Sequence, residues 1–180
     1  MAHAQQQNFF NSVKNKFPVC IMLIGLPCSG KSYFNQHTLY EMFPQLSQNN
    51  TVFVSTDIYI EQYATQNNKT YNEVFQEQIK PATKNMYNMI EDAVKHNKNI
   101  SWDQTNTSVK TRSFKLKAVP DTYEKIAVMF MTPEDKEHAR RLASRPGKHI
   151  PDEVMANMKA QLEIPTEKEG FDNIIFVDNK

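Results

Sequence analysis

A short glycine-containing loop carries the residues with the clearest chemistry. Gly25, Gly30, Lys31 and Ser32 fit the pattern G-x-x-x-x-G-K-[ST] and closely follow the apolar run at residues 19–24. Glycine lets the backbone curl so that successive N–H groups point at phosphate oxygens, while the lysine offers a positive charge and the serine a hydroxyl ligand for Mg²⁺. The residues expected to bind a nucleotide are Gly25, Pro27, Cys28, Ser29, Gly30, Lys31 and Ser32.

This loop predicts ATP as a ligand and Mg²⁺ as its counter-ion, because the charge of a bound triphosphate needs to be neutralised. Alone, the loop predicts a grip on phosphate, and hydrolysis, phosphoryl transfer and simple binding are all compatible with it. The residues that follow the other apolar runs must separate these three activities.

Asp57 follows the second apolar run, residues 51–55, and is expected at the same edge of the fold as the glycine loop. A carboxylate there can accept the proton of an attacking hydroxyl, as a general base does in phosphoryl transfer. The alternative is a helix cap, because Ser55, Thr56 and Asp57 all suit the start of a helix. Only one of the three positions needs to cap, which favours the catalytic interpretation.

The third apolar run ends in the stretch DQTN, which places Asp103 where a strand meets its loop, with Thr105 and Asn106 beyond it. An acidic residue at that point can hold Mg²⁺ through water or orient an acceptor. Asp103, Thr105 and Asn106 would contact the substrate. The alternative is turn chemistry, which the same residue types favour.

Arg141 and Arg145 are four residues apart and share one helix face if the helix continues that far. Two guanidinium groups could close over the triphosphate and stabilise the γ-phosphoryl group as it leaves. Pro146 and Gly147 would then break the helix and make it a hinged lid. The alternative is a solvated basic face paired with the acidic residues Glu134, Asp135 and Glu137.

The elements that position these residues alternate between strands and helices. Strands are expected at residues 19–24, 51–55, 99–102, 125–131 and 173–177. Helices are expected from the end of the glycine loop to about 43, from Thr70 to about 95 with a capping box and a kink at Pro81, and in two segments near 133–145 and 150–162. Such alternation predicts an α/β fold with a parallel sheet covered on both faces and its loops at one edge.

The composition fits one domain. The chain has 180 residues, 39% hydrophobic and 23% charged, with a formal net charge of +1, so an anion site must be local. We expect an N-terminal arm at residues 1–17, with a short amphipathic helix, and a single domain at 18–180. Two cysteines and no apolar stretch of about 20 residues suit a reducing cytoplasm and predict no membrane partner.

The order of these motifs resembles that of the 5′-hydroxyl polynucleotide kinases of bacteriophages and bacterial RNA-repair enzymes, within the P-loop kinase group. The resemblance spans roughly residues 19–178. It implies a three-layer P-loop NTPase fold with a five-stranded parallel sheet in the order 2-3-1-4-5 and a helical lid. It also implies that Asp57 is the general base, that Asp103 to Asn106 form the family's D-x-T-N stretch, and that Arg141 and Arg145 are lid arginines.

One position departs from that family. Three residues after the catalytic aspartate the family commonly has an arginine that holds the acceptor's 3′-phosphate, whereas this chain has Ile60. A second basic stretch at residues 110–117, with Lys110, Arg112, Lys115 and Lys117, could track a nucleic-acid backbone or form a solvated helix face.

The sequence therefore favours an ATP-dependent phosphotransferase acting on an acceptor hydroxyl, with a nucleic-acid 5′ end as the preferred acceptor. Two alternatives stay open: a kinase of a small molecule, such as a nucleoside, nucleotide, sugar or hydroxymethylated base, and an NTP-hydrolysing switch without an acceptor.

Overall fold

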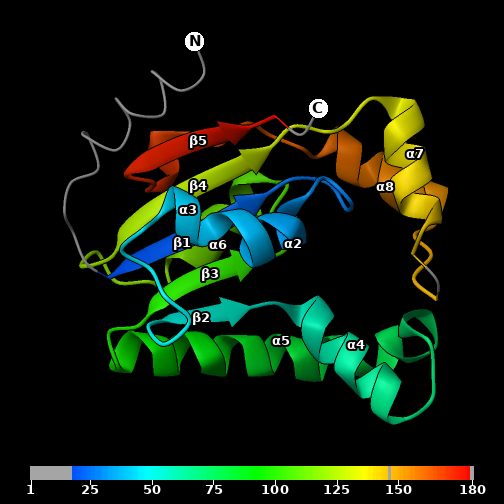
Figure 1. Ribbon diagram of the computed structural model, residues 1–180, viewed down its shortest axis with the longest axis horizontal. Helices are drawn as coiled ribbons and strands as arrows, with labels where there is room; N and C mark the ends of the chain where they lie inside the picture. Colours follow the sequence, from blue (N-terminus) through cyan, green and yellow to red (C-terminus); the bar gives the residue numbers. More distant parts are fainter. Residues whose placement is uncertain (1–17, 146, 179–180) are drawn as a thin grey trace.

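Five parallel strands form the centre of the molecule, which is a computed structural model that describes residues 18–145 and 147–178. The strand order is β2-β3-β1-β4-β5, as predicted (Figure 1). The strands are β1 Val19–Ile24, β2 Thr51–Val54, β3 Asn99–Asp103, β4 Glu124–Phe130 and β5 Asn173–Val177. The predictions for residues 1–17 and for Pro146 lie outside the described residues.

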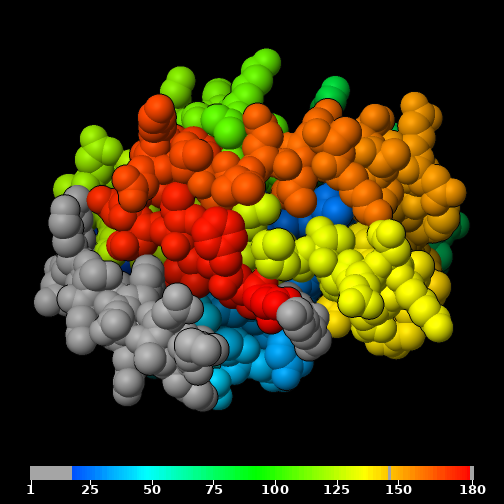
Figure 2. Space-filling model, turned by 90° about the horizontal axis from the view of Figure 1, so that it is seen from above, coloured from blue at the N-terminus to red at the C-terminus, as the bar shows by residue number. Residues whose placement is uncertain are grey.

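Helices cover both faces of the sheet. They are α2 Lys31–Tyr33, a π-helical segment η1 Phe34–Thr38, α3 Leu39–Met42, α4 Thr56–Gln66, α5 Tyr71–Lys95, α6 Val109–Leu116, α7 Asp135–Ala143, α8 Asp152–Ala160 and a 3₁₀ turn η2 Glu167–Glu169. In Figure 1, α4, α7 and α8 gather beyond the arrowheads of the strands, at the edge where the loops were expected. Figure 2 shows α7 and α8 side by side at that end, seen from above.

The alternating side chains of β1 explain the two layers of helices. Ile21 and Leu23 pack with Phe34 on one face, which belongs to the helical segment after the glycine loop. Met22 and Ile24 pack on the other face, in the cluster that includes residues of α5 and α6. All six residues of β1 are buried, as a central parallel strand requires.

The strand register brings the ends of β1, β2 and β3 to one edge. Leu23 pairs with Asp103, and Val54 pairs with Trp102. Gly25, Asp57 and Asp103 therefore follow strands that finish side by side, which places the sequence-predicted site at a single edge.

Three local predictions need correction or addition. The helix after the glycine loop is interrupted by η1 rather than being regular to residue 43. Helix α7 ends at Ala143, so Arg145 lies beyond it and does not share its face with Arg141. Helix α5 begins with the predicted capping box of Thr70 and Glu73 and runs through Pro81.

Among the described residues, none of the helices has the length and apolarity that a bilayer crossing requires.

Candidate active site

The glycine loop forms a tight turn around the ammonium group of its lysine. Gly25 has φ +153°, and its N–H donates to the carbonyl oxygen of Thr105 at 2.9 Å. A Cβ there would meet Ser29 Oγ at 2.7 Å. Lys31 Nζ donates to the carbonyl oxygens of Gly25 at 2.9 Å and Leu26 at 2.7 Å. Burial lowers the pKa of Lys31 to about 8. The loop thus holds one cation at its centre, as a phosphate site needs.

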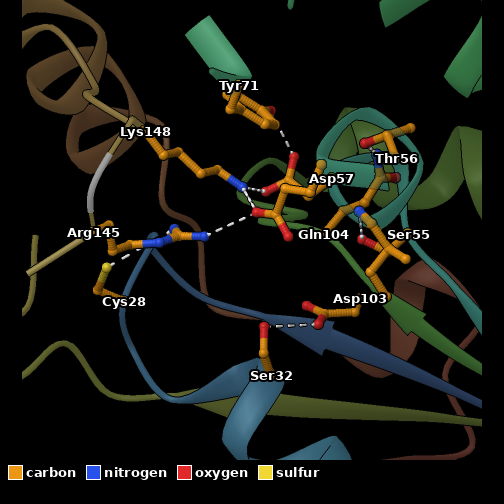
Figure 3. A network of polar contacts seen from close by, with 12 residues as sticks. Cys28, Ser32, Ser55, Thr56, Asp57, Tyr71, Asp103, Gln104, Arg145 and Lys148 are labelled. Atoms are coloured by element: carbon orange, nitrogen blue, oxygen red, sulfur yellow. Dashed lines mark hydrogen bonds and ion pairs between the residues drawn. The ribbon is translucent and has the colours of Figure 1, made fainter. Parts of the chain in front are cut away.

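Ser32 and Asp103 lie side by side next to the loop and are joined by a hydrogen bond. Ser32 Oγ donates to Asp103 Oδ2 at 3.1 Å (Figure 3). Asn35 Nδ2 lies 3.5 Å from the same oxygen. Burial raises the pKa of Asp103 above its ordinary value, and the nearby charge of Lys31 opposes this. A hydroxyl and a carboxylate fit Mg²⁺, which usually takes few protein ligands and completes its shell with water and phosphate oxygens.

Asp57 does not cap its helix. The cap of α4 is Ser55, whose Oγ accepts from the N–H of Ile58 at 3.4 Å. The carboxylate of Asp57 instead accepts from Tyr71 OH at 2.8 Å and from Lys148 Nζ at 2.6 Å (Figure 3). Burial would raise the pKa of Asp57, but Lys148 and the Tyr71 hydrogen bond outweigh it and hold the pKa below its ordinary value. The carboxyl is therefore ionised at neutral pH.

Both predicted arginines reach the same region from the segment at and after α7. Arg145 Nη2 lies 3.4 Å from Glu61 Oε1, and its Nη1 lies 4.0 Å from Cys28 Sγ in the glycine loop. Arg141 Nε lies 2.7 Å from Glu137 Oε1, so part of the predicted acidic pairing on α7 also forms. Arg140, next to it, is paired with Glu137 and is exposed.

These groups line one open cavity of about 1620 Å³. Its wall includes the predicted residues Pro27, Cys28, Gly30, Lys31, Ser32, Asp57, Asp103, Thr105, Arg141 and Arg145. Gly25 and Ser29 shape the loop and are not part of the wall, and Ser29 is fully buried. The structure thus brings the phosphate loop, the carboxylate and both arginines to the same space.

Asn106 is the predicted site residue that the structure places elsewhere. It is 2% exposed, and its Nδ2 donates to the carbonyl oxygen of Leu23 at 2.7 Å. Its Oδ1 accepts from Lys115 Nζ. Asn106 therefore ties the β3 loop to β1 and α6 instead of contacting a substrate.

The predicted basic stretch also has a different role. It forms α6, in which Arg112 is fully buried and Lys115 is 9% exposed. Arg112 binds both oxygens of Glu169, and Lys115 binds Gln104 and Asn106. Neither of these two side chains can follow a nucleic-acid backbone, so that interpretation is wrong for Arg112 and Lys115, whereas Lys110 and Lys117 are exposed.

Among the cavity residues that sequence reasoning missed are three around Asp57: Glu61, Tyr71 and Lys148. Glu61 lies one helical turn after Asp57 and could have been found from its spacing. Tyr71 stands directly after the capping residue of α5, and Lys148 stands three residues after Arg145. The contacts of Tyr71 and Lys148 with Asp57 depend on tertiary packing, which the sequence pattern does not give.

Comparison with known proteins identifies the family. A family model described as an AAA domain matches residues 20–165. A chain of the Pnkp1/Rnl/Hen1 RNA repair complex is similar over 90% of this chain and 49% of its own length, with 22% identity and a TM-score of 0.60.

Kti12 of Chaetomium thermophilum, solved with ADP-AlF3, matches over 89% of both chains with 16% identity and a TM-score of 0.57. A gluconokinase from Sinorhizobium meliloti 1021 matches over 91% of this chain and 84% of its own, with 16% identity and a TM-score of 0.52.

These likenesses concern the fold, and this chain spans about half the length of the RNA-repair chain. The glycine loop, the sheet order and the family match agree with one another. The chain belongs to the AAA domain family and has the P-loop kinase-like fold.

Proposed function

We propose that the protein is an ATP-dependent phosphotransferase that moves the γ-phosphoryl group to an acceptor hydroxyl. The observation that carries this proposal is the placement of Asp57. Its carboxylate lines the same cavity as Lys31 and Ser32 and takes no part in capping α4. A kinase needs a base and a phosphate loop on either side of a space for the acceptor, and the shared cavity supports this assignment.

In the proposed reaction, Asp57 accepts the proton of the acceptor hydroxyl, whose oxygen attacks the γ-phosphorus in line. The bond from the γ-phosphorus to the bridging oxygen breaks, and ADP leaves. Lys31, Arg141 and Arg145 stabilise the negative charge that passes to the leaving group. Ser32 and Asp103 would hold Mg²⁺, which supplies further neutralisation of phosphate charge when bound. The similarity to Kti12, solved with ADP-AlF3, supports a nucleotide in this cavity.

The acceptor we favour is a nucleic-acid 5′-hydroxyl end. The motif order described from the sequence supports it, as does the similarity to a chain of an RNA repair complex. The reaction would take place in the reducing cytoplasm, where the two free thiols, Cys20 and Cys28, are stable.

A small-molecule hydroxyl is the second candidate, and two burial observations support it. Ile60 is fully buried in a cluster between α4 and α5, so position 60 does not face the cavity. Arg112 and Lys115 are buried too, which removes half of the basic stretch that a polynucleotide could follow. A gluconokinase shares the fold, which fits an acceptor of this size.

The test uses γ-labelled ATP with a panel of 5′-hydroxyl DNA and RNA oligonucleotides, nucleosides and sugars. We expect label on one acceptor class, and loss of transfer in Asp57→Asn with ATP affinity within about threefold of wild type. Asp92→Asn, an exposed change on α5, is the matched control and should transfer normally. Transfer at the wild-type rate by Asp57→Asn contradicts the proposal. So does release of the label as inorganic phosphate with none of it on any acceptor.

A further inference from the structure

The ammonium group of Lys148 is held by three residues that lie outside the glycine loop. Its Nζ lies 2.6 Å from Asp57 Oδ2, 2.7 Å from Glu61 Oε1 and 4.0 Å from the centroid of the Tyr71 ring. The Lys148 side chain is 8% exposed. In Figure 3, Lys148 and Tyr71 approach Asp57 from the side away from Ser32 and Asp103. Two carboxylates and an aromatic face thus surround one cation beside the proposed base.

The backbone that carries Lys148 is fixed to the start of α5. Asn72 Nδ2 donates to the carbonyl oxygen of His149 at 2.7 Å, and Asn72 Oδ1 accepts from the His149 N–H at 2.9 Å. Gly147 has φ +71°, and a Cβ there would lie 3.2 Å from the Thr70 side chain. Residues 147–149 are therefore anchored to α5, and the anchoring aims Lys148 at Asp57.

Tyr71 and Glu61 complete the support of the carboxylate. Tyr71 OH donates to Asp57 Oδ1, which leaves Oδ2 to Lys148. Glu61 lies on the same helix as Asp57 and shares the Lys148 ammonium with it. With both of its oxygens bonded, the Asp57 carboxylate has a fixed plane, and its remaining lone pairs have a fixed direction.

We propose that Lys148 is the positioning residue of the phosphotransfer reaction: its ammonium group bridges Asp57 and Glu61 and so orients the carboxylate of the proposed base. This inference rests on the proposed function, because it assigns the partner of the proposed base. The arrangement also connects the base to residues 147–149, so a displacement of that segment would move Lys148 and, through it, the Asp57 carboxylate.

The charges around Asp57 fix the direction of the expected effect. Lys148 and Arg145 face it from the segment after α7, Tyr71 faces it from α5, and Glu61 lies on its own helix. Lys31 and Asp103 act across the cavity. Burial favours the protonated acid and Lys148 is the largest influence against it, so its loss moves the pKa of Asp57 upward.

The experiment compares Lys148→Met, Lys148→Arg and the wild type, with Lys159→Met as the matched control. Lys159 lies on α8, has a half-exposed side chain and pairs only weakly, at 3.4 Å, with Asp135. The Asp57 carboxyl is titrated by NMR with ¹³C-labelled aspartate, and its signal is identified by its absence in Asp57→Asn. Transfer from γ-labelled ATP is measured from pH 5 to 8 with the acceptor that wild type phosphorylates, and ATP affinity by equilibrium binding.

We expect the Asp57 titration in Lys148→Met to move up by at least about one pH unit. We also expect acceptor kcat/KM at pH 7 to fall tenfold or more, because the carboxylate loses its fixed orientation. ATP affinity should stay within about threefold, and Lys148→Arg should restore the low titration point. An unmoved Asp57 titration overturns the inference, as does a loss of ATP affinity equal to the loss of transfer, which would make Lys148 a phosphate ligand.

The two proposals fail differently. Transfer retained in Asp57→Asn removes the proposed base and with it the proposed function. Transfer lost in Asp57→Asn but normal in Lys148→Met overturns the Lys148 inference alone. If no acceptor is labelled, the proposed function fails, and the Asp57 titration still decides whether Lys148 sets the state of the carboxyl.

Discussion

Arg112 is expected to be among the most important side chains for the stability of the fold. The side chain of Arg112 is 0% exposed to solvent, and the side chain of its partner Glu169 is 2% exposed. The guanidinium donates to Glu169 Oε2 at 2.7 Å and to Glu169 Oε1 at 2.9 Å. It also donates to the carbonyl oxygens of Asn106, Thr107 and Glu163, at 3.0, 2.8 and 3.0 Å. One side chain thus joins α6, the β3 loop and the segment before β5.

Replacing it in Arg112→Met keeps the apolar stem but leaves the Glu169 carboxylate buried without its cation. Removing one partner of a buried ion pair costs about 3–5 kcal/mol. For a chain of this size that loss lowers Tm by roughly 6–20 °C, at about 2–4 °C per kcal/mol. The assay is urea unfolding, with the slope m checked for constancy, together with a thermal melt.

Lys110→Met is the matched control, because Lys110 lies on the same helix and is exposed. We expect it to change the free energy of unfolding by less than about 0.5 kcal/mol. The reasoning is refuted if Arg112→Met unfolds within that same margin of wild type with an unchanged m. Such a result would mean that the Glu169 carboxylate finds water or another donor once the guanidinium is gone.

Three further outcomes concern the cavity. Lys31→Ala should lower transfer by about two orders of magnitude or more, as loss of a transition-state contact does, measured with γ-labelled ATP. Arg141→Ala and Arg145→Ala should each reduce kcat more than ATP affinity, and equal losses would make them simple phosphate ligands. Because burial lowers the pKa of Lys31 to about 8, and phosphate binds the charged form, nucleotide affinity measured by calorimetry should fall as pH rises above 8. A flat profile from pH 7 to 9 would contradict that assignment.

The sheet was predictable because its strands carry strong local signals. Residues 19–24 are a continuous apolar run, and the strand formed by them is central and buried throughout. The capping box of Thr70 and Glu73 was predictable for the same reason, since its two members are three residues apart. The glycine loop combines such a strand with fixed glycine spacing, so its place at the sheet edge followed directly from the sequence.

The polar side chains of α6 were predicted less well, since a charged residue looks solvated in a sequence. Lys115 has its pKa lowered to about 8 by burial, and its ammonium group bonds Gln104 and Asn106. Nothing local distinguishes it from the exposed Lys117 two residues later. What separates them is the β3 loop packed against one face of the helix, which is a long-range contact.

Asp57 shows why the cation that pairs with a half-exposed carboxylate is hard to choose from sequence. Even partial burial of a carboxylate costs free energy unless a cation comes with it, so a positive partner could be expected in general terms. Several cations lie within nine residues of one another near the end of α7, and composition ranks none of them first. Backbone geometry decides which of these cations pairs with Asp57. The turn at Gly147 and the two hydrogen bonds of Asn72 direct Lys148 toward α4. A glycine and an asparagine, neither of which carries a charge, therefore determine which cation lies beside the proposed base.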